Sequence, residues 1–351
     1  MKLRRHVVTA MAVAGAMMLT ACGGSSSSSA PAGGNAGGDS SAQASSGEQT
    51  FNLKLSHGLA EDHAVHIQMT EWANEVKEKS NGTINIQIIP NGQLGSEADN
   101  ISSIQAGGLD MAKVSASTLG NFNNAWNALS VPYVFNDKDH FYNVMDGEIA
   151  EDLYKVTEGD GFIGLTWLDS GARSFYTAKT PIRKPEDLKG LKIRTMDSQM
   201  AIDMMNALGG SATVMSYSEI YTGMQQGVVD GAENNITALR DHSDVTQYYC
   251  YDEHTRIPDI IVISAKVWNS MSENQQKIMK ETAKEATEAY KTRWADFEAE
   301  VKANAEKNGV TFIEDVDTAA FQQACQSIYD NLKANDPDVY AIVEKIQNAG
   351  K

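Results

Sequence analysis

Basic residues are scarce in this sequence, and the shortage limits the partners that the protein can have. The 351 residues include 29 Lys and Arg against 46 Asp and Glu, a formal net charge of −17 at pH 7. An acidic surface repels phosphate backbones, so no nucleic-acid partner is expected. An anionic small molecule would have to be held by particular cationic side chains inside a cleft.

Motifs that mark enzymes and metal centres are also missing. The sequence has no Gly-x-Ser-x-Gly, no P-loop, no Cys-x-x-Cys and no His-Glu-x-x-His, so we expect no catalytic centre, no cofactor and no metal ion. There are only 3 cysteines. Outside the N-terminal segment, Cys250 and Cys325 are consistent either with a disulfide or with two buried free thiols.

The N-terminal segment has the composition of a secretory signal. A basic start precedes an apolar run over residues 7–19, which is shorter than the ~20 residues that span a bilayer. The four residues from Leu19 to Cys22 resemble a bacterial lipobox, which implies cleavage before Cys22 and a lipid on its sulfur. The alternative is an ordinary signal peptide followed by an incidental cysteine. We predict a lipoprotein signal peptide over residues 1–21.

Residues 22–49 are dominated by Gly and Ser. Such a segment cannot bury enough apolar surface to offset its ordering entropy, and its random-coil reach is on the order of 30 Å. We predict a flexible tether that holds a folded body away from a membrane. No later segment is long and apolar enough to cross a bilayer.

The body from about Thr50 onward has the periodicity of an α/β fold. Residues 51–55 alternate apolar and polar side chains, residues 65–76 repeat apolar side chains at helical spacing, and residues 84–88 alternate again. This strand–helix–strand unit predicts a parallel sheet. Further strands are expected at 111–114, 163–168, 191–194 and 260–263.

One segment predicts an unusually long helix. Apolar side chains keep helical spacing from Met279 to Val301, Ser272 and Gln275 offer a capping box, and Asn308 precedes a glycine. A helix over 272–308 would be about 55 Å long and would exceed one lobe of the body. The alternative is two helices with a kink.

The stretch from Trp167 to Asn235 carries the candidate binding residues. Arg194 ends a short apolar strand, and ligands of open α/β sheets bind outside the carboxyl ends of strands. A guanidinium there can grip a carboxylate through two parallel hydrogen bonds. Arg173 follows the strand that ends at Leu168 closely enough to reach the same end of a sheet.

Several motifs occur in order around this stretch. They cover residues 90–97, 108–111, 131–133, 170–176, 185–194, 215–221 and 227–235. Together they resemble the solute-binding proteins of tripartite ATP-independent periplasmic (TRAP) transporters, over essentially the whole body. The resemblance implies a two-lobe, periplasmic-binding-protein-like (Venus flytrap) α/β fold with a long helix spanning both lobes. We assign 50–170 plus 259–299 to lobe I and 171–258 plus 300–351 to lobe II.

The same resemblance implies roles for individual residues. Arg194 clamps the ligand carboxylate, Arg173 is a second cation, and Asn234 is a hydrogen-bonding partner. Tyr217 falls where the family places an aromatic ring against the ligand. Glu97, Ser115 and Asp197 fall at lining positions whose identity varies with the substrate. Apart from the resemblance, His57 is a further polar candidate for contact with ligand hydroxyls. Each role has an alternative. Arg194 could be a surface charge and Arg173 part of an ion pair between lobes. Asn234 could be a turn residue, Tyr217 a core residue, and Glu97, Asp197 and His57 solvated or capping residues.

The resulting expectation is an extracytoplasmic, lipid-anchored and monomeric binding protein, not an enzyme. It would capture a small organic acid by lobe closure and deliver it to the small and large membrane subunits of a TRAP transporter. Acidic lining residues suit hydroxyl groups, so Glu97, Asp197 and His57 favour a hydroxylated acid such as a hexuronate over a bare dicarboxylate. The alternatives are the receptor of an ATP-driven transporter, an extracytoplasmic sensor of organic acids and a secreted hydrolase.

Overall fold

The computed structural model describes residues 48–349. The predicted signal peptide, the lipidation site at Cys22 and nearly all of the tether lie outside the described residues. The described residues belong to one compact unit. Within them, no helix combines the length and the apolar composition that a membrane span requires.

The first sheet has the strand order β2-β1-β3-β10-β4. Its strands are β1 (Phe51–Ser56), β2 (Ile84–Ile89), β3 (Met111–Ser115), β4 (Phe162–Leu168) and β10 (Asp259–Ser264). β1 is parallel to β2 and β3, and β10 is antiparallel to β3 and β4. Helix α1 (Ala64–Lys79) connects β1 to β2, which confirms the predicted strand–helix–strand unit.

The second sheet has the strand order β11-β9-β5-β8-β6-β7. Its strands are β5 (Arg173–Thr177), β6 (Lys192–Thr195), β7 (Ser211–Val214), β8 (Gly231–Asn235), β9 (Tyr248–Thr255) and β11 (Thr311–Ile313). β6 is parallel to β7 and β8, whereas β5 is antiparallel to β8 and β9. The α/β prediction is therefore confirmed.

Two short segments carry the chain between the sheets. Residues 169–172 lead from β4 to β5, and residues 256–258 lead from β9 back to β10. An ion pair links the two segments, with Arg256 Nη1 3.5 Å from Asp169 Oδ1. The same Oδ1 accepts a 2.9 Å hydrogen bond from the backbone N–H of Gly171. The carboxylate of Asp169 therefore contacts both segments that connect the sheets.

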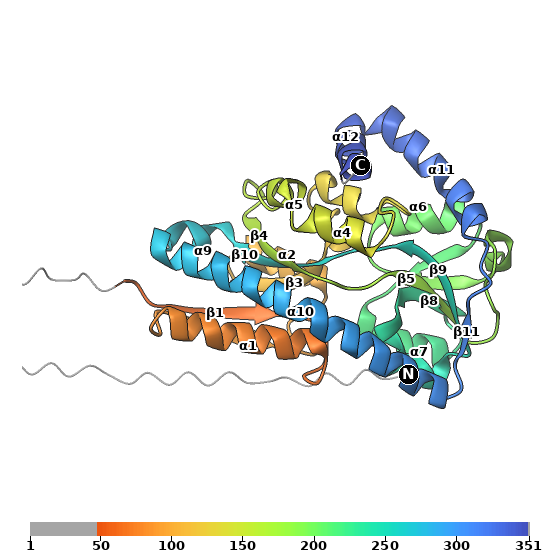
Figure 1. The fold of residues 1–351 in the computed structure, drawn as a ribbon, viewed down its shortest axis with the longest axis horizontal. Coiled ribbons are helices and arrows are strands. Elements are labelled where there is room, and N and C mark those ends of the chain that lie inside the picture. The colour runs from red at the N-terminus through yellow and green to blue at the C-terminus, as the bar shows by residue number, and fades with distance from the viewer. Residues whose placement is uncertain (1–47, 350–351) are drawn as a thin grey trace, which may run out of the picture. The chain divides into compact units, whose positions relative to one another are not determined.

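The long helix α10 (Glu273–Lys307) is the third connection. Its 35 residues correspond to about 52 Å at 1.5 Å per residue. Ser272 and Gln275 form the predicted capping box. α10 packs against α1 and β4 of the first sheet and against helix α8 (Leu239–His242) beside the second, and Figure 1 shows it running past both sheets. The single long helix is confirmed, and the kinked alternative is not observed.

Other helices cover the sheets. They are α2 (Glu97–Gln105), α3 (Ala116–Leu119), α4 (Lys138–Met145), α5 (Glu148–Leu153), α6 (Gln199–Ala207), α7 (Ile220–Gln225), α9 (Ala265–Ser270), α11 (Thr318–Asn335) and α12 (Pro337–Asn348). α11 packs against α6 and β9, whereas α12 packs against α5 and the 3₁₀ segment η1 (Asn124–Ser130). The lobe boundaries given above remain a prediction. Cys250 and Cys325 are both buried free thiols, so no disulfide joins them.

Candidate functional site

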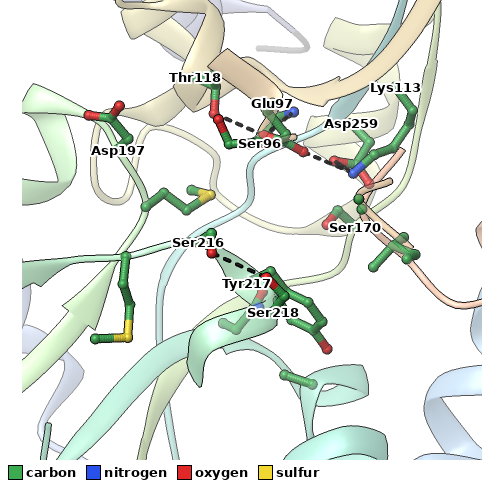
Figure 2. A pocket seen from close by; sticks show the side chains of 18 of the residues that line it. Ser96, Glu97, Lys113, Thr118, Ser170, Asp197, Ser216, Tyr217, Ser218 and Asp259 are labelled. Carbon is green, nitrogen blue, oxygen red and sulfur yellow. Dashed lines mark hydrogen bonds and ion pairs between the residues drawn. The ribbon is translucent and has the colours of Figure 1, made fainter. Parts of the chain in front are cut away.

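A cavity of about 660 Å³ is lined by residues of both sheets. The first sheet's side supplies the start of α2, the end of β3 and the start of β10. The second sheet's side supplies the ends of β6 and β8 and the 3₁₀ segment η3 (Tyr217–Glu219). Figure 2 shows Glu97, Lys113 and Asp259 on one wall and Ser216 to Ser218 on the facing wall. Most of these groups are polar and can form hydrogen bonds with a hydroxylated or charged ligand.

Arg194 lies on the wall formed by the second sheet. β6 is paired on both sides, by β7 and β8, and it places Arg194 near its carboxyl end. The side chain is buried, and its Nε donates a 2.9 Å hydrogen bond to Met215 O. Within residues 48–349, neither Nη atom makes a hydrogen bond or ion pair with the protein. Burial lowers the pKa of Arg194, and the guanidinium offers two donors to an anion in the cavity.

Arg173 is positioned by Glu233 and Asn234. Its Nε lies 2.7 Å from Glu233 Oε2, its Nη2 lies 2.9 Å from Glu233 Oε1, and its Nη1 lies 2.7 Å from Asn234 Oδ1. Asn234 Oδ1 also accepts a 2.9 Å bond from the N–H of Asn235. Both acceptor positions of this amide oxygen are therefore occupied, which leaves the Asn234 amide group to donate into the cavity.

His254 and Asp252 complete a buried charged chain behind Arg173. His254 Nδ1 lies 2.6 Å from Asp252 Oδ2 and His254 Nε2 lies 3.3 Å from Glu233 Oε2. Burial alone would lower the pKa of His254, but the carboxylates of Asp252 and Glu233 raise it to about 9. Burial likewise opposes ionisation of Glu233, yet Arg173 and His254 lower its pKa to about 2. Cations and carboxylates thus alternate in this buried row of side chains, in the order Arg173, Glu233, His254 and Asp252.

The facing wall contains three ionisable residues in contact. Lys113 Nζ lies 3.1 Å from Glu97 Oε1 and 3.0 Å from Asp259 Oδ1. Glu97 Oε2 accepts bonds from the N–H of Ser115, at 3.0 Å, and from Thr118 Oγ1, at 2.9 Å. Burial opposes ionisation of Glu97, but Lys113 and these hydrogen bonds lower its pKa. We call Glu97, Lys113 and Asp259 the acidic cluster.

The structure brings most of the predicted site residues together. The predicted residues that line the cavity are Arg194, Arg173, Asn234, Tyr217, Glu97, Asp197 and Ser115. Asn234 lies inside β8, so it is not a turn residue. Tyr217 Oη donates a 2.9 Å bond to Asp241 Oδ2, so its ring rather than its hydroxyl is available to a ligand. Arg173 pairs with Glu233 of its own sheet, which argues against an ion pair between lobes.

His57 is the predicted site residue that the structure does not bring to the cavity lining. Its side chain is fully buried and does not line the cavity. Its Nδ1 accepts a 3.1 Å bond from the N–H of Leu59, and its Nε2 lies 3.0 Å from His66 Nδ1. Burial lowers its pKa to about 3. His57 therefore shapes the loop after β1, whereas His63 lines the cavity.

Sequence reasoning missed Lys113, Thr118, Asp259 and Asn235, which also line the cavity. A signal was available for Lys113, because it is a lysine inside a strand whose other residues are all buried. Lysine is almost never fully buried without a partner. Asp259 lay immediately before a predicted strand and gave no comparable signal.

Comparisons with known proteins identify the family of this chain. A family model described as bacterial extracellular solute-binding protein, family 7, matches residues 55–336. The protein YiiZ of Salmonella typhimurium is 41% identical over 278 residues, which cover 78% of this chain and 85% of YiiZ. A solved TRAP periplasmic solute binding protein from Sulfitobacter, with bound β-D-galacturonate, has a TM-score of 0.82 and 34% identity. The match covers 85% of this chain and 100% of the Sulfitobacter chain. Another from Anaerococcus prevotii, with bound α/β D-glucuronate, has a TM-score of 0.81 and 34% identity, covering 85% and 98%.

Proposed function

This chain belongs to the bacterial extracellular solute-binding proteins of family 7, the TRAP type, and from that premise we propose that its ligand is a hexuronate. The family places the protein outside the cytoplasm and makes it a binding component of transport. The two-lobe α/β fold follows from the same likeness.

The observation that carries the proposal is the pair of Nη atoms of Arg194. Arg194 lines the cavity and neither Nη atom bonds to the protein within residues 48–349, whereas Arg173 is already held by Glu233 and Asn234. A carboxylate placed against Arg194 would receive two charge-assisted hydrogen bonds, and the Asn234 amide could add a third. In a cavity closed to water these contacts replace the hydration of the anion.

The sugar-acid class is supported by the rest of the lining. Hydroxyl and carboxylate groups of Glu97, Ser115, Thr118 and Asp259 can bond to sugar hydroxyls. The two solved relatives described above hold galacturonate and glucuronate. A hexuronate has one carboxylate and several hydroxyls, which matches a cavity lined by Arg194 and by many neutral or acidic partners.

The route of the ligand completes the proposal. The lobes close on the ligand by bending at residues 169–172 and 256–258, and the monomer then delivers it to the two membrane subunits of a TRAP transporter. The lipobox-like residues before Cys22 support a lipid anchor, and residues 22–49 would tether the binding body to it.

Two measurements on the purified protein test the proposal. Denaturation should release a co-purified hexuronate that mass spectrometry identifies, and calorimetric titration with D-glucuronate and D-galacturonate should show saturable binding at one site. Both sugars should be recovered unchanged after incubation. Release of a different class of compound, together with the absence of heat on titration with either uronate, would overturn the proposal.

A further inference from the structure

The acidic cluster has a composition that a carboxylate-binding cavity does not require. One ammonium, Lys113, is shared between the carboxylates of Glu97 and Asp259 at 3.1 Å and 3.0 Å. The side chains of Lys113 and Asp259 are only 6% and 10% exposed. Glu97 is 26% exposed, but burying the other two ionisable groups carries a desolvation penalty, so apolar residues would fill this wall at lower cost.

Sheet register fixes the cluster in place. β3 and β10 are antiparallel, with Asp259 opposite Ser115 and Ile261 opposite Lys113. Lys113 and Asp259 are therefore diagonal neighbours on one face of the ladder, within reach of a long side chain. Glu97 approaches from the first turn of α2 and is held by two further hydrogen bonds. The three groups present a fixed surface to the cavity.

This surface can bond to a hydroxyl but not readily to an anion. Asp259 Oδ2 has no hydrogen-bond partner within residues 48–349, and the Lys113 ammonium has one N–H beyond its two contacts. A hydroxyl can donate to the first group and accept from the second. A carboxylate can only accept, and it would meet two carboxylates across a single shared ammonium.

We infer that the acidic cluster determines the charge of the ligand, by admitting a hydroxyl-bearing end of a sugar acid and rejecting a second carboxylate. This inference rests on the proposed function, which places the ligand carboxylate against Arg194. Arg194 and the cluster belong to opposite sheets, so a ligand gripped at Arg194 extends its other end toward the cluster. The cavity thereby selects a uronate or aldonate, with one carboxylate, over the aldarate, with two.

The test compares two open-chain ligands that differ only at the far end with one ligand in the ring form. Galactonate and galactarate are both open chains, and a hydroxymethyl group in the first is a carboxylate in the second. Galacturonate serves as the ring-form reference. For the wild-type protein we expect calorimetric titration to give a Kd for galactarate at least about 100-fold weaker than for galacturonate, which corresponds to about 2.7 kcal/mol, with galactonate between the two.

Two variants remove one negative charge while keeping the shape of the side chain. Glu97→Gln and Asp259→Asn should each lower the ratio of the galactarate Kd to the galacturonate Kd by about tenfold or more. A purely structural role would weaken both ligands together and leave the ratio unchanged. Arg194→Lys is the matched control, because it should weaken both ligands without changing their ratio.

The outcomes separate this inference from the proposed function. A wild-type protein that binds neither galacturonate nor glucuronate overturns the proposed function and this inference with it. A wild-type protein that binds galacturonate and galactarate within about threefold of each other overturns this inference alone, as does a ratio that neither charge-removing variant changes.

Discussion

Glu233 holds Arg173 with both carboxylate oxygens, at 2.7 Å from Nε and 2.9 Å from Nη2. The backbone oxygen of Glu233 accepts a further bond from the same Nη2 at 2.7 Å. Arg173 therefore donates most of its N–H groups to the protein, whereas Arg194 donates only its Nε–H to any residue within 48–349. Both arginines line the cavity, but Arg173 is held by its own sheet, whereas the Nη atoms of Arg194 have no protein partner among the described residues.

Replacement of Arg194 tests the assigned clamp. Arg194→Ala should weaken uronate binding by about 30- to 5,000-fold, because truncating one partner of a desolvated charged pair costs about 2–5 kcal/mol. Arg194→Lys should recover only part of the affinity, since an ammonium keeps the charge but loses the planar fork. Calorimetric titration with D-galacturonate gives the affinities, and melting without ligand reports folding.

The matched control is Arg183→Ala. Arg183 pairs with Asp315 through side chains that are 43% and 74% exposed, and it does not line the cavity. Its loss should leave uronate affinity unchanged. If Arg194→Ala binds within about threefold of wild type, an effect under 1 kcal/mol, the clamp lies elsewhere.

Glu233→Gln tests the support of Arg173. The variant keeps the shape of the side chain but leaves two buried cations, Arg173 and His254, with less countercharge. Breaking a buried ion pair costs about 3–5 kcal/mol, so urea unfolding should show a loss of this order. Glu281→Gln is the control, because Glu281 is 60% exposed and lies 3.8 Å from Lys277. Equal stabilities of the two variants would contradict a supporting role for Glu233.

The sequence could predict those elements whose signals are local. Residues 51–55 and 84–88 alternate as strands do, and the capping box at Ser272 marks the start of α10. β8 was not predicted, because the Gly, Glu and Asn residues at 231–235 disfavour strands. Pairing with β5 on one side and β6 on the other overrides that preference.

The binding site was predictable only in part, for a related reason. Arg194 could be found because a strand end and a guanidinium are adjacent in the sequence. Lys113 and Asp259 are 146 residues apart, and only the antiparallel pairing of β3 with β10 brings them together. The absence of His57 from the cavity lining has the same origin, since the direction of its side chain depends on His66 and on the loop after β1.

Gly171 tests the geometry of the first crossing segment. Its φ of +67° disfavours other residues, and an added Cβ would lie 3.3 Å from Asn235 Cβ. Gly171→Ala should therefore lower the free energy of unfolding by about 1–3 kcal/mol. Gly159→Ala is the control, because an added Cβ there meets nothing within 4 Å. Unfolding curves that coincide for the two variants would show that the segment tolerates a different backbone.

Cys22→Ser tests the proposed lipid anchor. Without a sulfur the lipid cannot attach, so the variant should either leave the membrane fraction or accumulate as an uncleaved precursor. Fractionation and the mass of the N-terminal fragment measure both effects. Cys325→Ser, at a buried thiol of the binding body, controls for loss of a cysteine as such. Unchanged membrane association and processing of Cys22→Ser would refute the anchor.

His254 gives a pH dependence whose direction can be worked out. The imidazolium lies between Asp252 and Glu233, which raise the pKa to about 9 from an ordinary value of 6.5 even though burial acts in the opposite direction. A histidine whose pKa is higher in the folded state binds its proton more tightly there. Its contribution to stability is complete below about pH 6.5 and is lost as the pH rises through about 9.

The variant His254→Gln isolates this contribution, because other buried groups titrate alike in both proteins. Glu298 is one of them, since burial raises its pKa to about 7. At about pH 7 the wild type should be more stable than His254→Gln, and the difference should shrink by about 2 kcal/mol by about pH 9. Urea unfolding at several pH values measures the difference. A difference that is constant over this range would mean that His254 is neutral in the folded protein, and Glu233 would then have Arg173 as its only cationic partner within the described residues.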